Sequence, residues 1–279
     1  MYYNRNRHLG LSICHDREEA GEYKRFTMHT HTTAELFCFV AGNARYHIEG
    51  NSYLLQPGDI LLMRPAEAHY VEQDPNSPYE RICLNFEPGI LGELDPQQNL
   101  LRPYYDREPG KRNLYRLPGS DLVQIRSYLD QILKTGDRLK AVANLILLLR
   151  QLDSFFEKGN NEAAQTDSLE YRIIRYINDN LEKELSVGEL CDVFFISRAQ
   201  LCRRFKKITG TSVGKYISAK RLILARDLLL RGKKPTEVYS ECGYQDYSTF
   251  YRAYASYFGC SPKQLQTVET VGGDRLEIV

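Results

Sequence analysis

The sequence predicts a multidomain protein in which an all-β barrel or sandwich precedes an all-α domain with two helix-turn-helix motifs. Three observations support this fold class. Short β-branched and aromatic runs recur in the first third of the chain, and apolar residues at helical spacing replace them afterwards. Near the C-terminal end, one arrangement of short helix, tight turn and second helix occurs twice. The 279 residues are enough for two separate hydrophobic cores.

Strand-like runs fill the region from Glu35 to Phe86. Turn-forming pairs such as Gly42-Asn43 and Pro57-Gly58 separate them, which is typical of an all-β sandwich or barrel. The segment before residue 22 is polar, and it fits either an ordered edge strand or a mobile arm. The expected strands are ELFCFV (35–40), ARYHIEG (44–50), SYLLQ (52–56), DILLMRP (59–65), AHYVEQ (68–73) and YERICLNF (79–86).

Two helices are expected after the β region, at 121–133 and 138–156, because apolar residues recur there at helical spacing. The second contains an almost continuous apolar stretch at 142–149, so it needs cover on more than one side. It could pack on the barrel, on its neighbour or on the same helix of a second subunit. We favour the last arrangement and therefore expect a homodimer. The polar segment 159–167 has no periodicity and reads as a linker.

The first helix-turn-helix motif ends in a basic helix at 198–209. Ser197 and Gln200 have the spacing of a capping box at its start, and Gly210 is placed to end it. At about 100° per residue, one side of this helix is apolar and the opposite side is basic. Such a helix can enter the DNA major groove, although the same pattern also occurs on a solvated helix. The outward residues are Ala199, Arg203, Lys206 and Lys207, and the inward ones are Leu201, Phe205 and Ile208.

The second motif repeats this arrangement about fifty residues later. A long helix at 212–231 leads to Pro235, which begins a short helix, and then to a helix at 247–258 that Gly259 ends. A final short helix is expected from Ser261. A long connecting helix could hold two parallel readers roughly 34 Å apart, which matches successive major grooves. In the 247–258 helix, Phe250, Tyr254 and Tyr257 share one face, and Ser248, Thr249, Arg252 and Ser256 lie opposite.

The charge is distributed unevenly along the chain. Residues 168–267 contain 17 Lys and Arg against 10 Asp and Glu, a net +7, whereas residues 1–167 carry a net −4. A basic C-terminal region favours nucleic acid as its partner. No leader-like or membrane-spanning run is expected, because the longest apolar run is Leu145–Leu149. The seven scattered cysteines have no metal or redox spacing, so we expect thiols in a reducing cytoplasm.

The C-terminal region resembles the AraC/XylS-type DNA-binding domain. Ser197, Leu201, Arg203 and Phe205 followed by Gly210 are similar to the first half of that domain. The stretch GYQDYSTFYRAY (243–254) followed by FGCSP (258–262) is similar to its most specific signature. The resemblance implies a bacterial transcription regulator that binds double-stranded promoter DNA as a dimer and works with RNA polymerase.

The same resemblance implies roles for individual residues. Base-facing positions are matched by Ala199 and Arg203 in the first reader, with Gln200 beside them, and phosphate contacts by Lys206 and Lys207. In the second reader, family members often carry two lysines where this chain has Ala255-Ser256, so the first reader is expected to anchor the domain. The expected DNA-binding residues are Ala199, Gln200, Arg203, Arg204, Lys206, Lys207, Tyr247, Ser248, Thr249 and Arg252.

The N-terminal region resembles the cupin superfamily, whose fold is a jelly-roll barrel. His29-Thr30-His31, Glu35 and Gly42, with Pro57-Gly58 and His69 later, are similar to its paired motifs, although ten residues separate Gly58 from His69. In metal-binding cupins the positions of His29, His31, Glu35 and His69 converge on a metal, and this donor set suits a divalent ion. A metal-free ligand pocket and plain structural hydrogen bonding remain as alternatives. We expect a ligand site without a metal or other cofactor, formed by His29, His31, Glu35, Tyr46, His69 and Arg81.

These observations predict a transcription regulator rather than an enzyme, controlled by a small-molecule effector such as a sugar or related metabolite. The alternative is a cupin metalloenzyme with a regulatory DNA-binding tail. The expected organisation is a ligand-sensing domain (1–105), a helical, dimerising connector (106–158), a linker (159–167), a double helix-turn-helix domain (168–267) and a tail (268–279).

Overall fold

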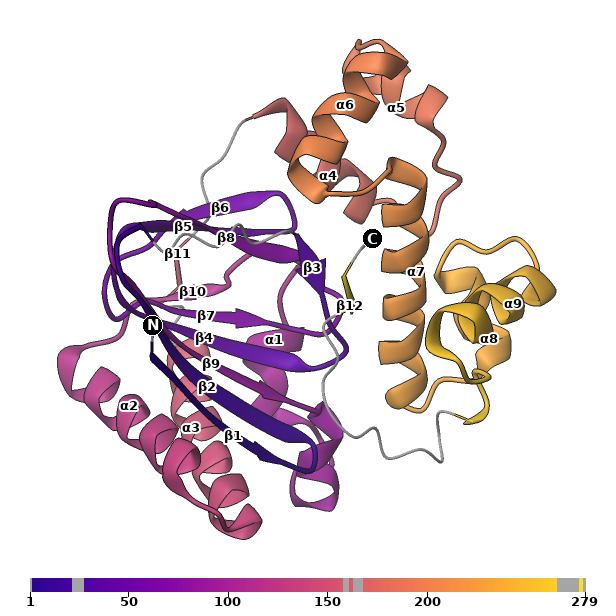
Figure 1. The fold of residues 1–279 in the computed structure, drawn as a ribbon. Helices are drawn as coiled ribbons and strands as arrows, with labels where there is room; N and C mark the ends of the chain where they lie inside the picture. The colour runs from indigo at the N-terminus through magenta and orange to yellow at the C-terminus, as the bar shows by residue number, and fades with distance from the viewer. Residues whose placement is uncertain (1, 22–27, 158–160, 163–167, 265–275, 278–279) are drawn as a thin grey trace.

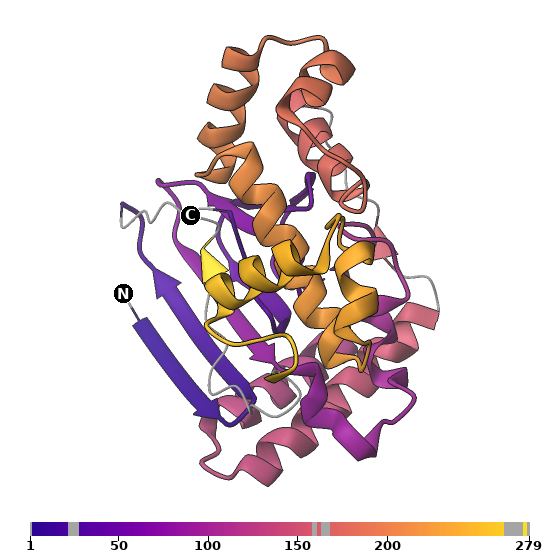
Figure 2. The same ribbon diagram turned by 90° about the vertical axis from the view of Figure 1, so that its right-hand side faces the viewer.

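The computed structural model describes residues 2–21, 28–157, 161–162, 168–264 and 276–277. A β-rich half and a helical half lie side by side, and the long helix α7 (Val213–Leu230) faces the β-rich half along its length (Figures 1 and 2). The predicted fold class, an all-β barrel joined to an all-α domain with two helix-turn-helix motifs, is confirmed.

The barrel consists of two antiparallel sheets. One has the strand order β1-β2-β9-β4-β7-β10-β11, and the other has the order β12-β3-β8-β5-β6. All six strands predicted between residues 35 and 86 are present, and the N-terminal segment is an ordered β1–β2 hairpin at the sheet edge. The strands are β1 (Tyr2–His8), β2 (Leu11–Glu18), β3 (His29–Thr30), β4 (Ala34–Ala41), β5 (Ala44–Ile48), β6 (Asn51–Leu54), β7 (Ile60–Met63), β8 (His69–Gln73), β9 (Tyr79–Phe86), β10 (Leu114–Tyr115), β11 (Asn161–Glu162) and β12 (Leu276–Glu277).

Alternation along β4 separates two cores. Glu35 and Phe37 face the interior of the barrel, where Phe37 is paired with Cys83 of β9. Leu36 and Cys38 face the other side of the sheet and pack under α2 and α3. The barrel is therefore lined by one face of each strand and supported on the outside by helices.

The helices predicted at 121–133 and 138–156 are confirmed as α2 (Gly119–Lys134) and α3 (Arg138–Glu157). They pack on each other and on the seven-stranded sheet, burying Leu145 and Leu152 completely. Leu139 and Leu147 on the outer side of α3 remain 78% and 51% exposed. Before them, three short helices join the barrel to this layer, namely η1 (Pro88–Leu94), η2 (Asn99–Leu101) and α1 (Arg102–Tyr105).

The helical half follows the sequence closely. Ser197 and Gln200 form the predicted capping box, and Gly210 ends α6 with a φ of 76°. At the expected final helix, Ser261 and Gln264 exchange cap hydrogen bonds, and residues 265–275 lie outside the described ones. Of the expected linker and tail, only β11 and β12 are described. Besides α7, the helices are α4 (Leu169–Asn178), α5 (Val187–Phe194), α6 (Arg198–Thr209), α8 (Pro235–Glu241) and α9 (Tyr247–Phe258).

Candidate functional site

A buried polar cluster occupies one end of the barrel interior. Glu35 of β4 lies between His31, which precedes that strand, and His69, which begins β8. Glu35 Oε2 is 2.8 Å from His31 Nε2 and 3.6 Å from His69 Nε2. Their side chains are at most 8% exposed, so each polar atom must find its partner inside the protein.

The protonation of both imidazoles is constrained by the backbone. His31 Nδ1 is 2.8 Å from the carbonyl oxygen of Thr33, and His69 Nδ1 is 2.8 Å from that of Glu67. Because a carbonyl oxygen only accepts, each Nδ1 carries a proton, and Nε2 is the ring atom of each histidine that faces Glu35. The carboxylate of Glu35 therefore faces two Nε2 atoms, and either a proton on Nε2 or a metal ion between them can hold the three groups together.

The pKa of Glu35 agrees with this arrangement. Burial would raise it, but hydrogen bonds and charge from His31 and His69 hold the pKa of Glu35 well below its usual range. The carboxylate is therefore ionised in the cluster, and it attracts a positive charge.

This donor set fits a divalent metal ion. The three candidate ligand atoms of His31, Glu35 and His69 lie within 4.8 Å of one another. Both histidines donate Nδ1–H to a backbone carbonyl, as metal-binding histidines usually do. Two imidazoles and one carboxylate suit borderline ions such as Zn²⁺, Fe²⁺ or Co²⁺.

The other residues expected at this site divide into two groups. His29 and Tyr46 lie beside the cluster, with ring centroids 4.5 Å and 5.9 Å from that of His69. Arg81 is placed differently, because it pairs with Phe39, four residues along β4 from Glu35. Its guanidinium is 3.3 Å from Asp16 Oδ2. The structure thus brings together five of the six expected ligand residues, and the rings are packed closely around the carboxylate of Glu35.

The loop 64–69 connects this cluster with the helical half. His69 ends the loop inside the barrel, whereas the carbonyl oxygen of Ala66 accepts a hydrogen bond from Lys220 of α7. Lys220 also pairs with Glu49, whose carboxylate accepts the backbone N–H of Ala68. The side chains of Lys220 and Glu49 are only 5% and 2% exposed. A charged contact between the two halves is thus completely enclosed.

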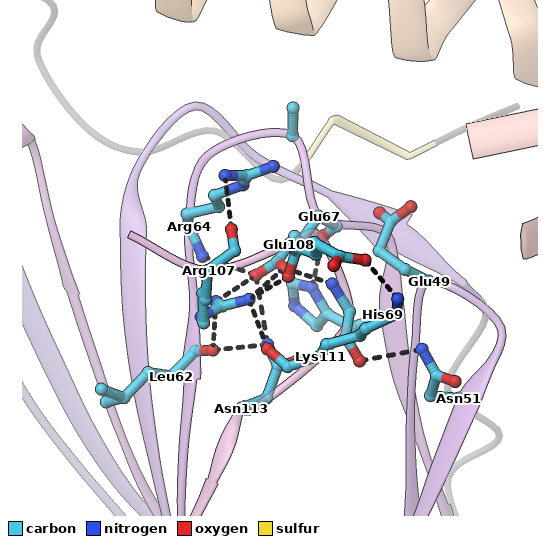
Figure 3. A network of polar contacts seen from close by, with 12 residues as sticks. Glu49, Asn51, Leu62, Arg64, Glu67, His69, Arg107, Glu108, Lys111 and Asn113 are labelled. Atoms are coloured by element: carbon cyan, nitrogen blue, oxygen red, sulfur yellow. Dashed lines mark hydrogen bonds and ion pairs between the residues drawn. The ribbon is translucent and has the colours of Figure 1, made fainter. Parts of the chain in front are cut away.

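Glu67 makes the same loop rigid (Figure 3). Arg107 donates to both carboxylate oxygens of Glu67, at 2.6 Å and 2.7 Å, and Gly110 N–H donates a further bond at 2.7 Å. Burial would raise the pKa of Glu67, but the charge of Arg107 lowers it to about 2. A carboxylate with this many donors holds the loop backbone in one conformation.

The contact with Lys220 also contains unusual backbone geometry. Glu49 and Ala66 have φ angles of 51° and 70°, in the left-handed region that β-carbon-bearing residues avoid. Each costs of order 1 kcal/mol or more. At Glu49 this conformation belongs to the two-residue turn with Gly50 (φ 84°) that joins β5 to β6.

Two further contacts join the halves. Near the start of α4, Tyr171 stacks on His47 at 4.9 Å, and its hydroxyl lies 2.8 Å from that of Tyr70. Burial lowers the pKa of His47 to about 4. Near the end of α7, Tyr105 donates a hydrogen bond to Asp227 at 3.1 Å.

The first expected DNA reader is α6. Its basic residues are exposed, and Leu201 and Phe205 are buried as predicted. Arg204 Nη1 is 2.7 Å from Glu170 Oε1 of α4, so its charge is partly neutralised within the domain. Gln200 Oε1 is engaged by Ser197 in the capping box. The exposed row on α6 comprises Ala199, Gln200, Arg203, Arg204, Lys206 and Lys207.

The second expected reader is α9. Asp246 caps its first turn by accepting the N–H of Thr249, and Phe250 and Tyr254 are fully buried. Arg252 is its one basic residue and is exposed, as are Ser248 and Thr249. Tyr247 is half-buried against the rings of Tyr239 and Phe250. The charge available for phosphate contacts is therefore concentrated on α6.

Lys220, Asp227 and their partners are not among the residues predicted from the sequence. A local signal exists, because Lys220 and Asp227 are seven residues apart in α7 and so share one face. Charged residues at that spacing on a face flanked by leucines indicate a buried polar contact. Their partners, Glu49 and Tyr105, lie more than 100 residues away and carry no such signal.

Two family models match the chain. One is described as an AraC-like ligand binding domain and matches residues 15–149. The other is described as a helix-turn-helix domain and matches residues 190–267. The first range contains the polar cluster and the loop 64–69, and the second contains both α6 and α9.

Curated relatives match over most of their length. The HTH-type transcriptional activator RhaS of Citrobacter koseri is 26% identical over 246 residues, covering 86% of this chain and 87% of that protein. The probable transcriptional regulator LumQ of Photobacterium leiognathi is 26% identical over 247 residues, covering 87% and 93%. Among solved structures, ToxT of Vibrio cholerae covers 92% of this chain and 98% of that chain at 14% identity, with a TM-score of 0.39.

Among the described helices, none is both long enough and apolar enough to cross a bilayer.

Proposed function

Because the chain belongs to the AraC-type DNA-binding transcription regulators and has an AraC-like ligand-binding domain, we propose that an effector bound in the barrel controls how α7 is held. Helix α7 joins the two helix-turn-helix motifs, so its position determines how α6 and α9 are presented to successive major grooves.

The loop 64–69 carries this proposal. One end of the loop supplies His69 to the polar cluster, and the middle supplies the carbonyl oxygen that accepts from Lys220. An effector that binds His69 must move or stiffen the loop 64–69, which the ion pair of Glu67 and Arg107 holds in place. Because interfaces of this kind have discrete arrangements, a small shift at His69 is expected to change the occupancy of the Lys220 contact.

The proposed effector is a small polar molecule, such as a sugar or related metabolite, that contacts His29, His31, Glu35, Tyr46 and His69, with Arg81 farther along the barrel. His31, Glu35 and His69 would hold a divalent ion, which would supply a Lewis acid for hydroxyl or carboxylate oxygens of the effector. The chain's own part is to keep both Nε2 lone pairs directed at the site through the carbonyls of Thr33 and Glu67.

A cupin metalloenzyme with a DNA-binding tail is the second candidate, and the fit of the cluster to an ion favours it. The named relatives are transcription regulators, which favours the non-enzymatic function. Turnover of a substrate by the metal-loaded protein, abolished by His31→Ala, would establish the enzyme. An effector that changes DNA affinity without being consumed would establish the regulator.

DNA recognition is proposed to depend mainly on α6. Sequencing the genomic DNA that the full-length protein retains should yield a site for affinity measurements. Arg203→Ala is then expected to cost about 1–3 kcal/mol at that site and to relax specificity at one base pair. Arg172→Gln, an exposed arginine of α4, serves as the control. An equal loss on random DNA would show that Arg203 contacts only phosphate.

The proposed assembly is a homodimer in the cytoplasm that recruits or contacts RNA polymerase at a promoter. The outer side of α3 supports the dimer, since Leu139, Ala143 and Leu147 recur every four residues and are exposed there. Leu147→Glu should convert the dimer to a monomer in sedimentation while leaving the fold intact.

A further inference from the structure

A cavity of about 170 Å³ lies between the two halves, at the C-terminal end of α7. The barrel half contributes Thr32 and residues between Glu87 and Tyr105, and the helical half contributes residues between Arg226 and Arg231. None of its lining residues belongs to the histidine cluster, and Thr32 in its wall is the chain neighbour of His31.

The walls of the cavity combine apolar side chains with acidic and basic ones. Pro88, Leu91, Pro96 and Leu101 line it from the barrel side, and Leu230 lines it from α7. An apolar cavity of about 150 Å³ accommodates a benzene molecule. The volume therefore suits a body of about one six-membered ring.

The carboxylates around the cavity are already engaged. Asp95 accepts backbone N–H groups of Asn99 and Leu100 at 2.9 Å and 2.8 Å. Asp227 accepts the hydroxyl of Tyr105. The carboxylate of Glu87 points toward Gly10 in the β1–β2 turn. Its Oε2 atom is 3.8 Å from the position that a β-carbon on Gly10 would occupy.

Two guanidinium groups border the cavity. Arg226 Nε is buried without a hydrogen-bond partner among the described residues, and its guanidinium lies 4.9 Å over the ring of Phe258. Arg231 lies 4.0 Å over the ring of Tyr105 and 4.0 Å from Asp227. A planar guanidinium can bind a carboxylate through two parallel hydrogen bonds.

We propose that this cavity binds a small monocarboxylate, with its apolar ring or branched chain against Leu91, Leu101 and Leu230 and its carboxylate on Arg226 and Arg231. The ligand touches both halves at once, so it binds only while α7 stays against the barrel half. It therefore acts as a second effector that stabilises the docked arrangement in proportion to its concentration.

Three probes of one shape test the proposal on the full-length protein. Cyclohexanecarboxylate should bind in calorimetry with a Kd of roughly 10 µM to 1 mM, as expected for so small a ligand. Cyclohexanecarboxamide and cyclohexylmethylammonium should bind at least tenfold more weakly. Equal binding of the amide, or no binding of the carboxylate, would overturn the proposal.

Variants locate the site. Arg226→Gln should weaken carboxylate binding at least tenfold, and Arg172→Gln should leave it unchanged. Leu230→Trp, at a half-exposed position, should block the cavity without disturbing the core. His69→Gln should bind the carboxylate like the wild type, which separates this site from the barrel effector. Unchanged binding in both Arg226→Gln and Leu230→Trp would place the ligand elsewhere and contradict the proposal.

Discussion

Helix α7 contacts the barrel half at two charged residues on one face, Lys220 and Asp227, about 10 Å apart along the helix axis. The Lys220 contact is enclosed, and it touches a loop that reaches the histidine cluster. The Asp227 contact has a single hydrogen bond from Tyr105, and it borders an open cavity.

The difference between the two contacts indicates different roles. The partners of Lys220 are bonded to a rigid loop, so this enclosed contact is either formed or broken. It can therefore respond to a structural change inside the barrel. A contact beside a cavity can gain a ligand without losing a bond. We therefore infer that the Lys220 contact responds to the effector in the barrel. The contact at Asp227 separately changes how firmly α7 is held against the barrel half.

The largest effect is expected from Lys220→Met, which keeps the length of the side chain and removes its charge. Glu49 would then be buried without its partner, so the free energy of unfolding should fall by about 3–5 kcal/mol in urea. Lys215→Met, on the exposed side of the same helix, should change it by less than about 0.5 kcal/mol. Similar losses of unfolding free energy in the two variants would show that the enclosed contact stabilises the protein no more than an exposed lysine does.

A smaller effect is expected from pH at the contact between α4 and the barrel. His47 binds a proton near pH 6.5 in the unfolded chain but, owing to burial, only near pH 4 in the folded protein. Its stabilising contribution is present above pH 6.5 and is lost as the pH falls toward 4. Between pH 7 and pH 5 the loss should be about 2 kcal/mol. His47→Gln should remove this part of the pH dependence, and an unchanged slope would refute the assignment.

The smallest effect is expected at the Asp227 end. Tyr105→Phe removes one hydrogen bond to a carboxylate that the adjoining cavity can expose to solvent, so it should cost about 1 kcal/mol. The DNA response to the barrel effector should be retained. A loss as large as that of Lys220→Met would remove the distinction between the two contacts.

Much of the fold follows from local chemistry. Alternation in ELFCFV and YERICLNF predicts two strands with one interior face, and the structure pairs them directly. Ser197, Gln200 and Gly210 define the ends of α6 because caps satisfy backbone groups within a few residues. The histidines and Glu35 could be grouped because their spacing is local to β3 and β4, with His69 added by resemblance.

The contacts between the two halves could not be predicted in this way. Lys220 is 171 residues from Glu49, and Tyr105 is 122 residues from Asp227. A lysine in a helix is usually solvated, so its burial depends on the docking of the halves rather than on its neighbours. Arg204 illustrates the same limit, since its ion pair with Glu170 depends on how α6 packs against α4.

The central claim is that the loop 64–69 couples the histidine cluster to α7. A double-mutant cycle of His69→Gln and Lys220→Met, read by urea unfolding of the full-length protein, tests it most directly. We predict a coupling free energy of at least about 1 kcal/mol between these residues, and additivity within about 0.5 kcal/mol for His69→Gln combined with Tyr105→Phe. Additivity of His69→Gln with Lys220→Met, or equal coupling in both cycles, would contradict the account.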